Sequence, residues 1–193
     1  MCQQDEQDKQ EGAWKTKEAA EKAFPNEKWV DTGLLKFDYA GENYEFLSDI
    51  AGIKVAQSRL TGLKDDEKVL VKELRQGKIL SDNGLSIYIL PKMKDQNGEN
   101  IPGPDAIVNG VLFEFKNITG GIDRVEIRFR QSRKQCENVY LKIDNPGISK
   151  DDVISRIRSA LRDKKYSGGT NGNLIIYLAQ TGETCFMSIN DLK

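Results

Sequence analysis

The sequence predicts an α/β (α+β) fold with an αβββαβ core and a mixed sheet, extended at its N-terminus by a small helix and a hairpin. Three observations predict this class. Two β-favouring runs, 105–108 and 111–116, are separated by Asn109-Gly110, the strongest short hairpin signal. Residues 149–164 carry a single apolar stripe of helical period. Strand-length apolar runs at 139–143 and 174–179 flank that helix, as in parallel strands joined by a crossover.

The first third of the chain looks like an addition to this core. Residues 1–12 are polar and are expected to form a disordered lead. Ala13–Phe24 is predicted as a helix that stops at Pro25, and the alternation over Leu34–Leu47 predicts a hairpin. We expect residues 13–62 to be an accessory segment.

The main domain is expected over residues 63–193 and opens with a helix. Asp65 and Asp66 are candidate caps for Glu67–Gln76, and Gly77 is the predicted end of that helix. Ser86–Leu90 follows as a strand.

Residues 123–137 allow two interpretations. Val125, Ile127 and Phe129 alternate with charged residues, which by period alone favours a strand. Val125, Phe129, Ser132 and Cys136 also fall at i, i+4, i+7 and i+11, which favours a helix. We prefer the helix, because a parallel return to the sheet needs a crossover of about a dozen residues.

Composition excludes several classes of function. The 193 residues contain no histidine, which removes imidazole bases, imidazole zinc ligands and Ser-His-Asp triads. Three cysteines without CxxC spacing predict neither a disulfide framework nor a zinc knuckle, and Cys136 is expected to be a small core residue. The glycine-rich residues 167–172 lack the GK[ST] ending of a phosphate loop and are interpreted as a flexible connection.

Charge and hydropathy give weaker indications. Lys plus Arg total 29 against 30 for Asp plus Glu, so any basic surface must be local. No apolar run approaches the roughly 20 residues of a membrane span. No signal peptide is expected, although Met1-Cys2 leaves open a trimmed lipoprotein start or a cut from a longer chain.

The two-residue turn predicts a cluster of charged side chains. It sets a register in which Asp105 lies directly opposite Glu114, and Lys116 shares the face of Glu114. Two carboxylates in this position need compensation by the lysine, a raised carboxylate pKa or a divalent cation such as Mg²⁺. The competing interpretation is an ordinary solvated strand face.

At these residues the sequence resembles a known motif. Pro104-Asp105, eight intervening residues and Glu114-Phe115-Lys116 resemble the PD-(D/E)XK nuclease motif. The stretch from Glu67 to about residue 179, including GPDAIVNGVLFEFKNITG, looks like the C-terminal tRNase domains of CdiA-type contact-dependent growth inhibition toxins and related polymorphic toxins.

The resemblance implies a metal-dependent endonuclease that hydrolyses phosphodiester bonds in RNA, most specifically tRNA. It assigns Asp105 and Glu114 as ligands of Mg²⁺ or Mn²⁺, Lys116 as the group that positions water or stabilises charge, and Glu67 as a further ligand or base. Glu73 is the less favoured helix acid. The family also includes barnase-like and EndoU-like tRNases that work without metal. In that version Lys116, Arg128 and Glu114 would be the main catalytic residues.

Substrate binding is expected on the predicted helix over 123–137. The polar residues at i, i+4, i+7 and i+11, opposite the apolar stripe, are Arg124, Arg128, Gln131 and Gln135. They are candidates for gripping phosphates, and a solvated helix face is the alternative.

A toxin of this type implies a cognate immunity protein, export as part of a larger bacterial protein, and action in the cytoplasm of a target cell. A different class also fits the scaffold, namely a non-catalytic binding module or phage structural domain, because fold does not determine function.

Overall fold

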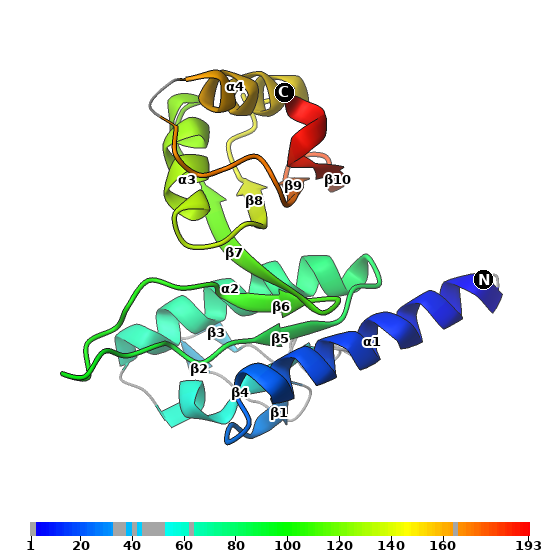
Figure 1. Cartoon of the computed structure of the whole chain (residues 1–193), viewed down its shortest axis with the longest axis vertical. Coiled ribbons are helices and arrows are strands. Elements are labelled where there is room, and N and C mark those ends of the chain that lie inside the picture. The colour runs from blue at the N-terminus through cyan, green and yellow to red at the C-terminus, as the bar shows by residue number, and fades with distance from the viewer. Residues whose placement is uncertain (1–2, 33–37, 40–41, 44–52, 62–63, 164–165) are drawn as a thin grey trace. The chain divides into compact units, whose positions relative to one another are not determined.

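The computed structural model describes residues 3–32, 38–39, 42–43, 53–61, 64–163 and 166–193 of the chain (Figure 1). Side chains are described for 11–32, 53–60, 68–163 and 166–193. Within the described residues, no helix is both long and apolar enough to span a bilayer. The elements, with 3₁₀ helices labelled η, are α1 (Gln3–Ala23), β1 (Trp29–Asp31), β2 (Asp38–Tyr39), β3 (Glu42–Asn43), β4 (Ile53–Ala56), η3 (Gln57–Thr61), α2 (Lys64–Asp82), β5 (Ile87–Ile89), β6 (Ala106–Val108), β7 (Val111–Ile118), α3 (Asp123–Arg133), β8 (Val139–Ile143), α4 (Lys150–Arg162), β9 (Asn173–Leu178), β10 (Glu183–Ser188) and η4 (Ile189–Leu192).

The chain forms two compact units. The first contains Met1–Ile101 and Asp105–Val111, and the second contains Pro102–Pro104 and Leu112–Lys193. Helices and a mixture of parallel and antiparallel strands occur in both, so the predicted α+β class is confirmed. The division differs from the boundary expected near residue 62, because the described part of 13–62 belongs to one unit with α2, β5 and β6.

In the first unit, two helices cover opposite faces of one sheet. Its strands lie in the order β1-β4-β5-β6, with β4 and β5 parallel and the outer pairs antiparallel. Tyr88 faces α1, where it clusters with Ala20 and Ile107. Ile87 and Ile89 face α2 (Figure 1). Burial on both faces explains why β5 is an uninterrupted apolar run.

The helices of this unit are longer than the sequence predicted. α1 begins at Gln3, so residues 3–12, expected as a disordered lead, are helical. α2 continues past Gly77 to Asp82, and Gly84, with a φ of 82°, follows its end. Gly77 lies inside the helix where a Cβ would come within 3.5 Å of Ile53. Gly77 therefore faces the sheet from inside the helix at ordinary contact distance, and Gly84 provides the left-handed residue after the helix.

Two short strands of this unit were not predicted, and most of one predicted hairpin lies outside the described residues. β1 and β4 pair antiparallel, and β4 is almost completely buried. Of the hairpin predicted over Leu34–Leu47, the structure describes only β2 and β3, which pair antiparallel; the remainder lies outside the described residues.

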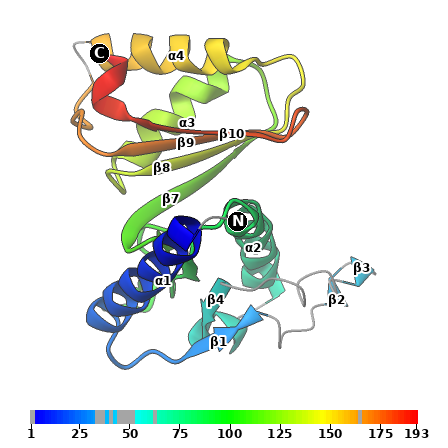
Figure 2. The same ribbon diagram turned by 90° about the vertical axis from the view of Figure 1, so that its right-hand side faces the viewer.

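The second unit contains two consecutive β-α-β crossovers. Its strands lie in the order β7-β8-β9-β10, with β7, β8 and β9 mutually parallel and β10 antiparallel to β9. α3 and α4 pack on the same sheet face as η4 (Figure 2), around a core that includes Phe129, Leu141, Ile157 and Ile176.

The structure confirms a helix at α3. Val125 and Phe129 are fully buried, whereas Ile127, which suggested a strand, is 41% exposed. The edge strand β10 was not predicted.

Arg133 contacts the glycine-rich residues 167–172, for which we predicted a flexible connection. Arg133 Nη2 donates to the Gly168 carbonyl at 2.8 Å, and Arg133 Nε donates to the Tyr166 hydroxyl at 3.1 Å. Gly172 has a φ of 110°, and a Cβ there would lie 2.1 Å from the Glu137 carbonyl oxygen. Glycines occur here because the loop passes too close to the end of α3 for side chains.

Replacing Gly172 with alanine should therefore destabilise the protein by more than about 1 kcal/mol, because the backbone conformation and the space both exclude a Cβ. Urea unfolding would measure the loss. Gly121→Ala is the matched control, since a Cβ at Gly121 meets nothing within 4 Å. Equal stability of the two variants would show that the loop can relax freely.

Candidate active site

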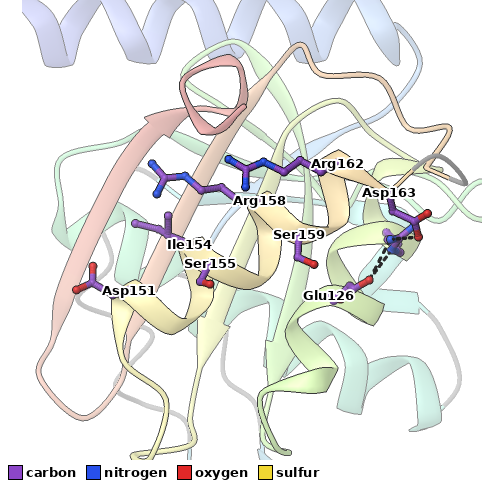
Figure 3. Close-up of a pocket in the computed structure, with 9 residues that line it drawn as sticks. Glu126, Asp151, Ile154, Ser155, Arg158, Ser159, Arg162 and Asp163 are labelled. Carbon is purple, nitrogen blue, oxygen red and sulfur yellow. Dashed lines mark hydrogen bonds and ion pairs between the residues drawn. The ribbon is translucent and has the colours of Figure 1, made fainter.

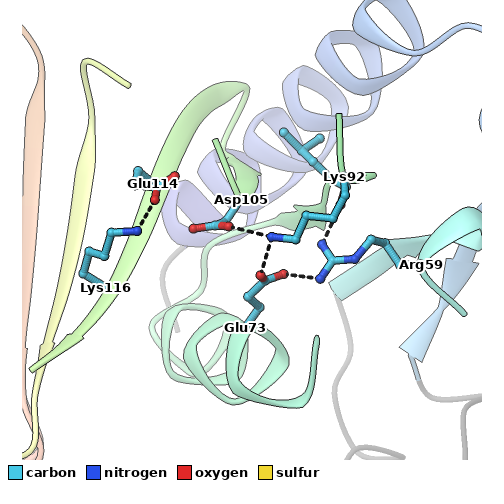
Figure 4. A network of polar contacts seen from close by, with 7 residues as sticks. Arg59, Glu73, Lys92, Asp105, Glu114 and Lys116 are labelled. Atoms are coloured by element: carbon cyan, nitrogen blue, oxygen red, sulfur yellow. Dashed lines mark hydrogen bonds and ion pairs between the residues drawn. The ribbon is translucent and has the colours of Figure 1, made fainter. Parts of the chain in front are cut away.

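β7 brings an acid and a lysine together in the second unit. Glu114 and Lys116 are two residues apart on one strand, so their side chains leave the same face, as predicted. Lys116 Nζ forms an ion pair with Glu114 Oε1 (Figure 4). The Glu114 side chain is 2% exposed and that of Lys116 is 21% exposed. Glu114 thus supports Lys116 from the buried side, and Lys116 is the member that a ligand can reach.

Lys116 opens into a cavity of about 480 Å³. Its lining holds three cations and no acid, and the residues are Pro102, Lys116, Arg128, Gln131, Lys134 and Gln135. All six belong to the second unit. Cationic donors converging on one hollow suit a ligand with several anionic oxygen acceptors, such as a phosphodiester.

The hydrogen bond between Arg128 and Gln131 defines how this cavity presents its groups. Arg128 Nη1 donates to Gln131 Oε1 at 3.0 Å. Because a guanidinium only donates, the amide oxygen of Gln131 must face Arg128, and its NH₂ group is turned away from Arg128. Gln131 can therefore offer a further donor to an acceptor-rich ligand.

The helix predicted over 123–137 ends at Arg133, so Gln135 lies in the turn after α3. Gln135 lines the cavity with Arg128, whereas Arg124 is exposed on the first turn and is not among the lining residues. Arg133, in the last turn of α3, is 6% exposed and donates a hydrogen bond to the 167–172 loop.

Cys136 is half-buried, where we expected a core position. Its thiol lies 3.1 Å from the Leu112 carbonyl oxygen, and burial raises its pKa. A raised pKa disfavours the thiolate, so the thiol is poorly suited to act as a nucleophile.

The first unit contains a separate network of buried charges (Figure 4). Arg59 from η3 contacts Glu73 from α2, with 2.9 Å between Nη2 and Oε2. Lys92, after β5, lies 2.9 Å from Glu73 Oε1 and 3.2 Å from Oδ1 of Asp105, before β6. Arg59 Nη1 also donates to the Leu90 carbonyl at 2.9 Å. Two acids and two cations thus neutralise one another inside this unit.

The electrostatics of this network follow from its burial. Burial raises the pKa of Glu73, and Arg59 and Lys92 oppose that rise. Burial also acts to lower the pKa of Lys92, but Glu73 and Asp105 outweigh it, so the net shift is upward. The ammonium of Lys92 is therefore held in its charged form between two carboxylates.

The predicted metal ligands do not form a metal centre within the described residues. The side chain of Glu67 lies outside them. Asp105 contacts Lys92, and Glu114 contacts Lys116, so each acid already neutralises an ammonium. Among the described side chains, no three acid or thiol groups are placed to hold a metal ion. Asp105 and Glu114 belong to different units, and metal dependence stays a prediction.

The turn that set the predicted register has the expected conformation. Asn109 and Gly110 have φ values of 47° and 85°, both positive as a type I′ turn requires. Asp105 belongs to the first unit and Glu114 to the second, and their direct pairing stays a sequence prediction.

Sequence reasoning missed Arg59 and Lys92 and placed less weight on Glu73 than on Glu67. A signal existed for Glu73, because Leu70, Glu73, Leu74 and Gly77 fall at i, i+3, i+4 and i+7 on the buried side of α2. An acid within an apolar stripe implies a buried partner. No short-range pattern pointed to Arg59, which lies fourteen residues earlier in another element.

Comparisons with known proteins identify a partial relationship. The family profile of the contact-dependent growth inhibition CdiA C-terminal domain matches residues 102–180. These residues contain Asp105, Glu114, Lys116 and all residues of the 480 Å³ cavity.

A chain from a CdiA-CT/CdiI toxin and immunity complex of Burkholderia pseudomallei is similar with a TM-score of 0.47 and 17% identity, over 66% of this chain and 90% of that chain. At this level the likeness bears on neither the site nor its ligands. No curated protein matches the sequence.

Proposed function

We propose that this chain is the nuclease domain of a bacterial toxin that cleaves phosphodiester bonds in RNA, with tRNA as its substrate. The observation that carries the proposal is the cavity in which Lys116, Arg128 and Lys134 converge, because it offers cations to a phosphate without an acid in the lining. The profile match over 102–180 supports a toxin domain delivered by a larger protein into target cells.

Cations in this arrangement would lower the barrier to RNA cleavage. When the 2′-hydroxyl attacks the adjacent phosphorus, the P–O5′ bond breaks, and a 2′,3′-cyclic phosphate and a 5′-hydroxyl are formed. Solvent water accepts the proton lost from the 2′-oxygen and returns one to the 5′-oxygen, so the step balances without a side-chain base. In the transition state, negative charge develops on the phosphate oxygens, and donors held in fixed positions stabilise that charge better than water does.

We assign each side chain a role from its exposure to solvent. Lys116 and Arg128 contact the phosphate, and Lys116 is the proposed catalytic residue. Glu114, almost fully buried, is a positioning residue that holds the Lys116 ammonium in place. Gln131, oriented by Arg128, donates to a substrate oxygen.

The geometry supports this route better than the metal-dependent hydrolysis predicted from Asp105, Glu114 and Glu67. Both described acids already neutralise a lysine, whereas the cavity residues stabilise the phosphate charge directly and need only solvent water to carry the proton. Mg²⁺ or Mn²⁺ remains the cofactor that the competing route requires.

Incubation of the purified protein with total tRNA, in EDTA and separately in Mg²⁺ or Mn²⁺, tests the proposal. We expect cleavage to persist in EDTA and to leave 2′,3′-cyclic phosphate ends, because no step needs a metal. Activity that vanishes in EDTA and returns with Mg²⁺ would instead support the metal-dependent route. Intact tRNA under every condition would contradict the nuclease proposal and favour a non-catalytic binding module.

An active toxin of this kind requires a protective partner in the cell that makes it. We propose a cognate immunity protein whose acidic surface covers the cations of the cavity. Expression of the chain alone should arrest growth, and co-expression of the partner should relieve the arrest. Harmless expression of the chain without any partner would contradict both this proposal and the toxin assignment.

A further inference from the structure

Three cavities of the second unit lie around α3, and neighbouring ones share a lining residue. The cavity at Lys116 shares Lys134 with a smaller one of about 170 Å³, which is also lined by Arg130 and Tyr166. The smaller cavity shares Arg130 with a third, of about 750 Å³, between α3 and α4 (Figure 3). Each cavity thus shares a lining residue with the next from β7 to α4, and we call this row of three cavities the α3 groove.

The side chains that line its middle part contact one another. The Tyr166 ring stacks on Phe129, with 6.1 Å between centroids and an interplanar angle of 16°. The guanidinium of Arg130 lies 5.7 Å from the same ring, and Arg133 Nε donates to the Tyr166 hydroxyl. A strand of RNA leaving the Lys116 cavity would therefore pass a wall in which Arg130, Arg133 and Phe129 all contact Tyr166.

The arginines at the α4 end of the α3 groove differ in whether an acid already neutralises them. Arg130 is engaged, because its Nη2 lies 3.0 Å from Glu126 Oε1 and 2.6 Å from Asp163 Oδ2. Arg158 and Arg162 are exposed one turn apart on α4, and neither makes an ion pair within the part of the chain that the structure describes.

The remaining groups at this end add donors and one acid. The hydroxyls of Ser155 and Ser159 line the same cavity, beside the two arginines (Figure 3). Two of the three lining acids, Glu126 and Asp163, already neutralise Arg130, and the third, Asp151, lies in the first turn of α4. Two cations with adjacent hydroxyl donors are thus left for an external anion.

We propose that Arg158 and Arg162 form a second phosphate-binding site, which holds the backbone of the same RNA that enters the Lys116 cavity. The inference rests on the proposed function and extends it: the α3 groove selects structured RNA over short oligonucleotides, because only a long substrate reaches both ends. Arg158 and Arg162 bind substrate and take no part in the chemistry.

The test is the double variant Arg158→Ala/Arg162→Ala, compared with the control Arg156→Ala. Arg156 lies on the same helix, but its Nη2 is already 2.7 Å from Asp123 Oδ1. Binding of tRNA is measured by fluorescence anisotropy over a salt series, and cleavage is measured on tRNA and on a trinucleotide.

We expect the double variant to bind tRNA about tenfold more weakly, and the slope of log K against log salt to fall by roughly two, since two phosphate contacts are lost. Trinucleotide cleavage should be unchanged, and Arg156→Ala should behave as the parent does. Parental tRNA affinity in the double variant would overturn the second site. If the parent cleaves tRNA but the double variant is unaltered, only this inference fails. If the parent neither binds nor cleaves tRNA, the proposed function fails with it.

Discussion

Replacing Lys116 with alanine should lower RNA cleavage by about two to three orders of magnitude, the usual cost of removing one group that stabilises transition-state charge. The Lys116 ammonium is the lysine that Glu114 positions at the mouth of the 480 Å³ cavity. Its loss removes a positive charge from the phosphate and leaves Glu114 without the cation that it faces. Single-turnover cleavage of tRNA, together with circular dichroism to verify folding, would measure the effect.

Lys142→Ala is the matched control for this experiment. Lys142, on the neighbouring strand β8, forms an ion pair with Asp144 at the same two-residue spacing, and its side chain is 20% exposed. It is not among the residues that line the cavity. We expect the control to retain parental activity. Equal losses in both variants would mean that any lysine on this sheet matters, and the assignment of Lys116 would be wrong.

Replacing Glu73 with alanine should destabilise the protein by about 3 to 5 kcal/mol, because it leaves a buried charge without its partner. The Arg59 side chain is 3% exposed and that of Glu73 is 6% exposed. Without the carboxylate, Arg59 would keep its bond to the Leu90 carbonyl but would lose the acid that it contacts, and Asp105 alone would remain for two cations. Urea unfolding, with the midpoint and slope fitted together, would measure the change.

Two further variants make this result interpretable. Asp82→Ala breaks the Lys78–Asp82 pair on the same helix, whose side chains are 33% and 60% exposed, and should change stability by no more than about 1 kcal/mol. The double variant Arg59→Met/Glu73→Leu should recover most of the loss, because it removes both charges and keeps their volume. A Glu73→Ala protein as stable as the parent would show that water reaches the network.

Several elements of the fold were predictable because short-range rules determine them. The Asn109-Gly110 turn requires two positive φ angles, and glycine and asparagine adopt them most readily. The amphipathic pattern of α4 is strong, and the capping box of Ser149 with Asp152 marks its start. At α3, the length needed for a crossover decided correctly between helix and strand, although the period of two suggested otherwise.

Other elements could not be predicted, because the packing of distant segments decides them. Gly77 looked like a helix end, but α2 continues to Asp82 and packs this part of its surface against β4 and β5. β1 and β4 are too short to be recognised from their pattern, and they form because β4 adds to β5. The 167–172 loop looked flexible, and Arg133 holds it from α3.

For the site, the sequence by itself determined that Glu114 and Lys116 leave one face of a strand, and that Arg128 and Gln131 share one side of a helix. Backbone periodicity sets both facts within a few residues. Only the tertiary structure decided that Lys116, Arg128 and Lys134 line one cavity, and that Glu73 is buried against Arg59 and Lys92. The reason is physical: the neighbours of a charge, and its access to solvent, depend on chain segments that are distant in sequence and meet only when the protein folds.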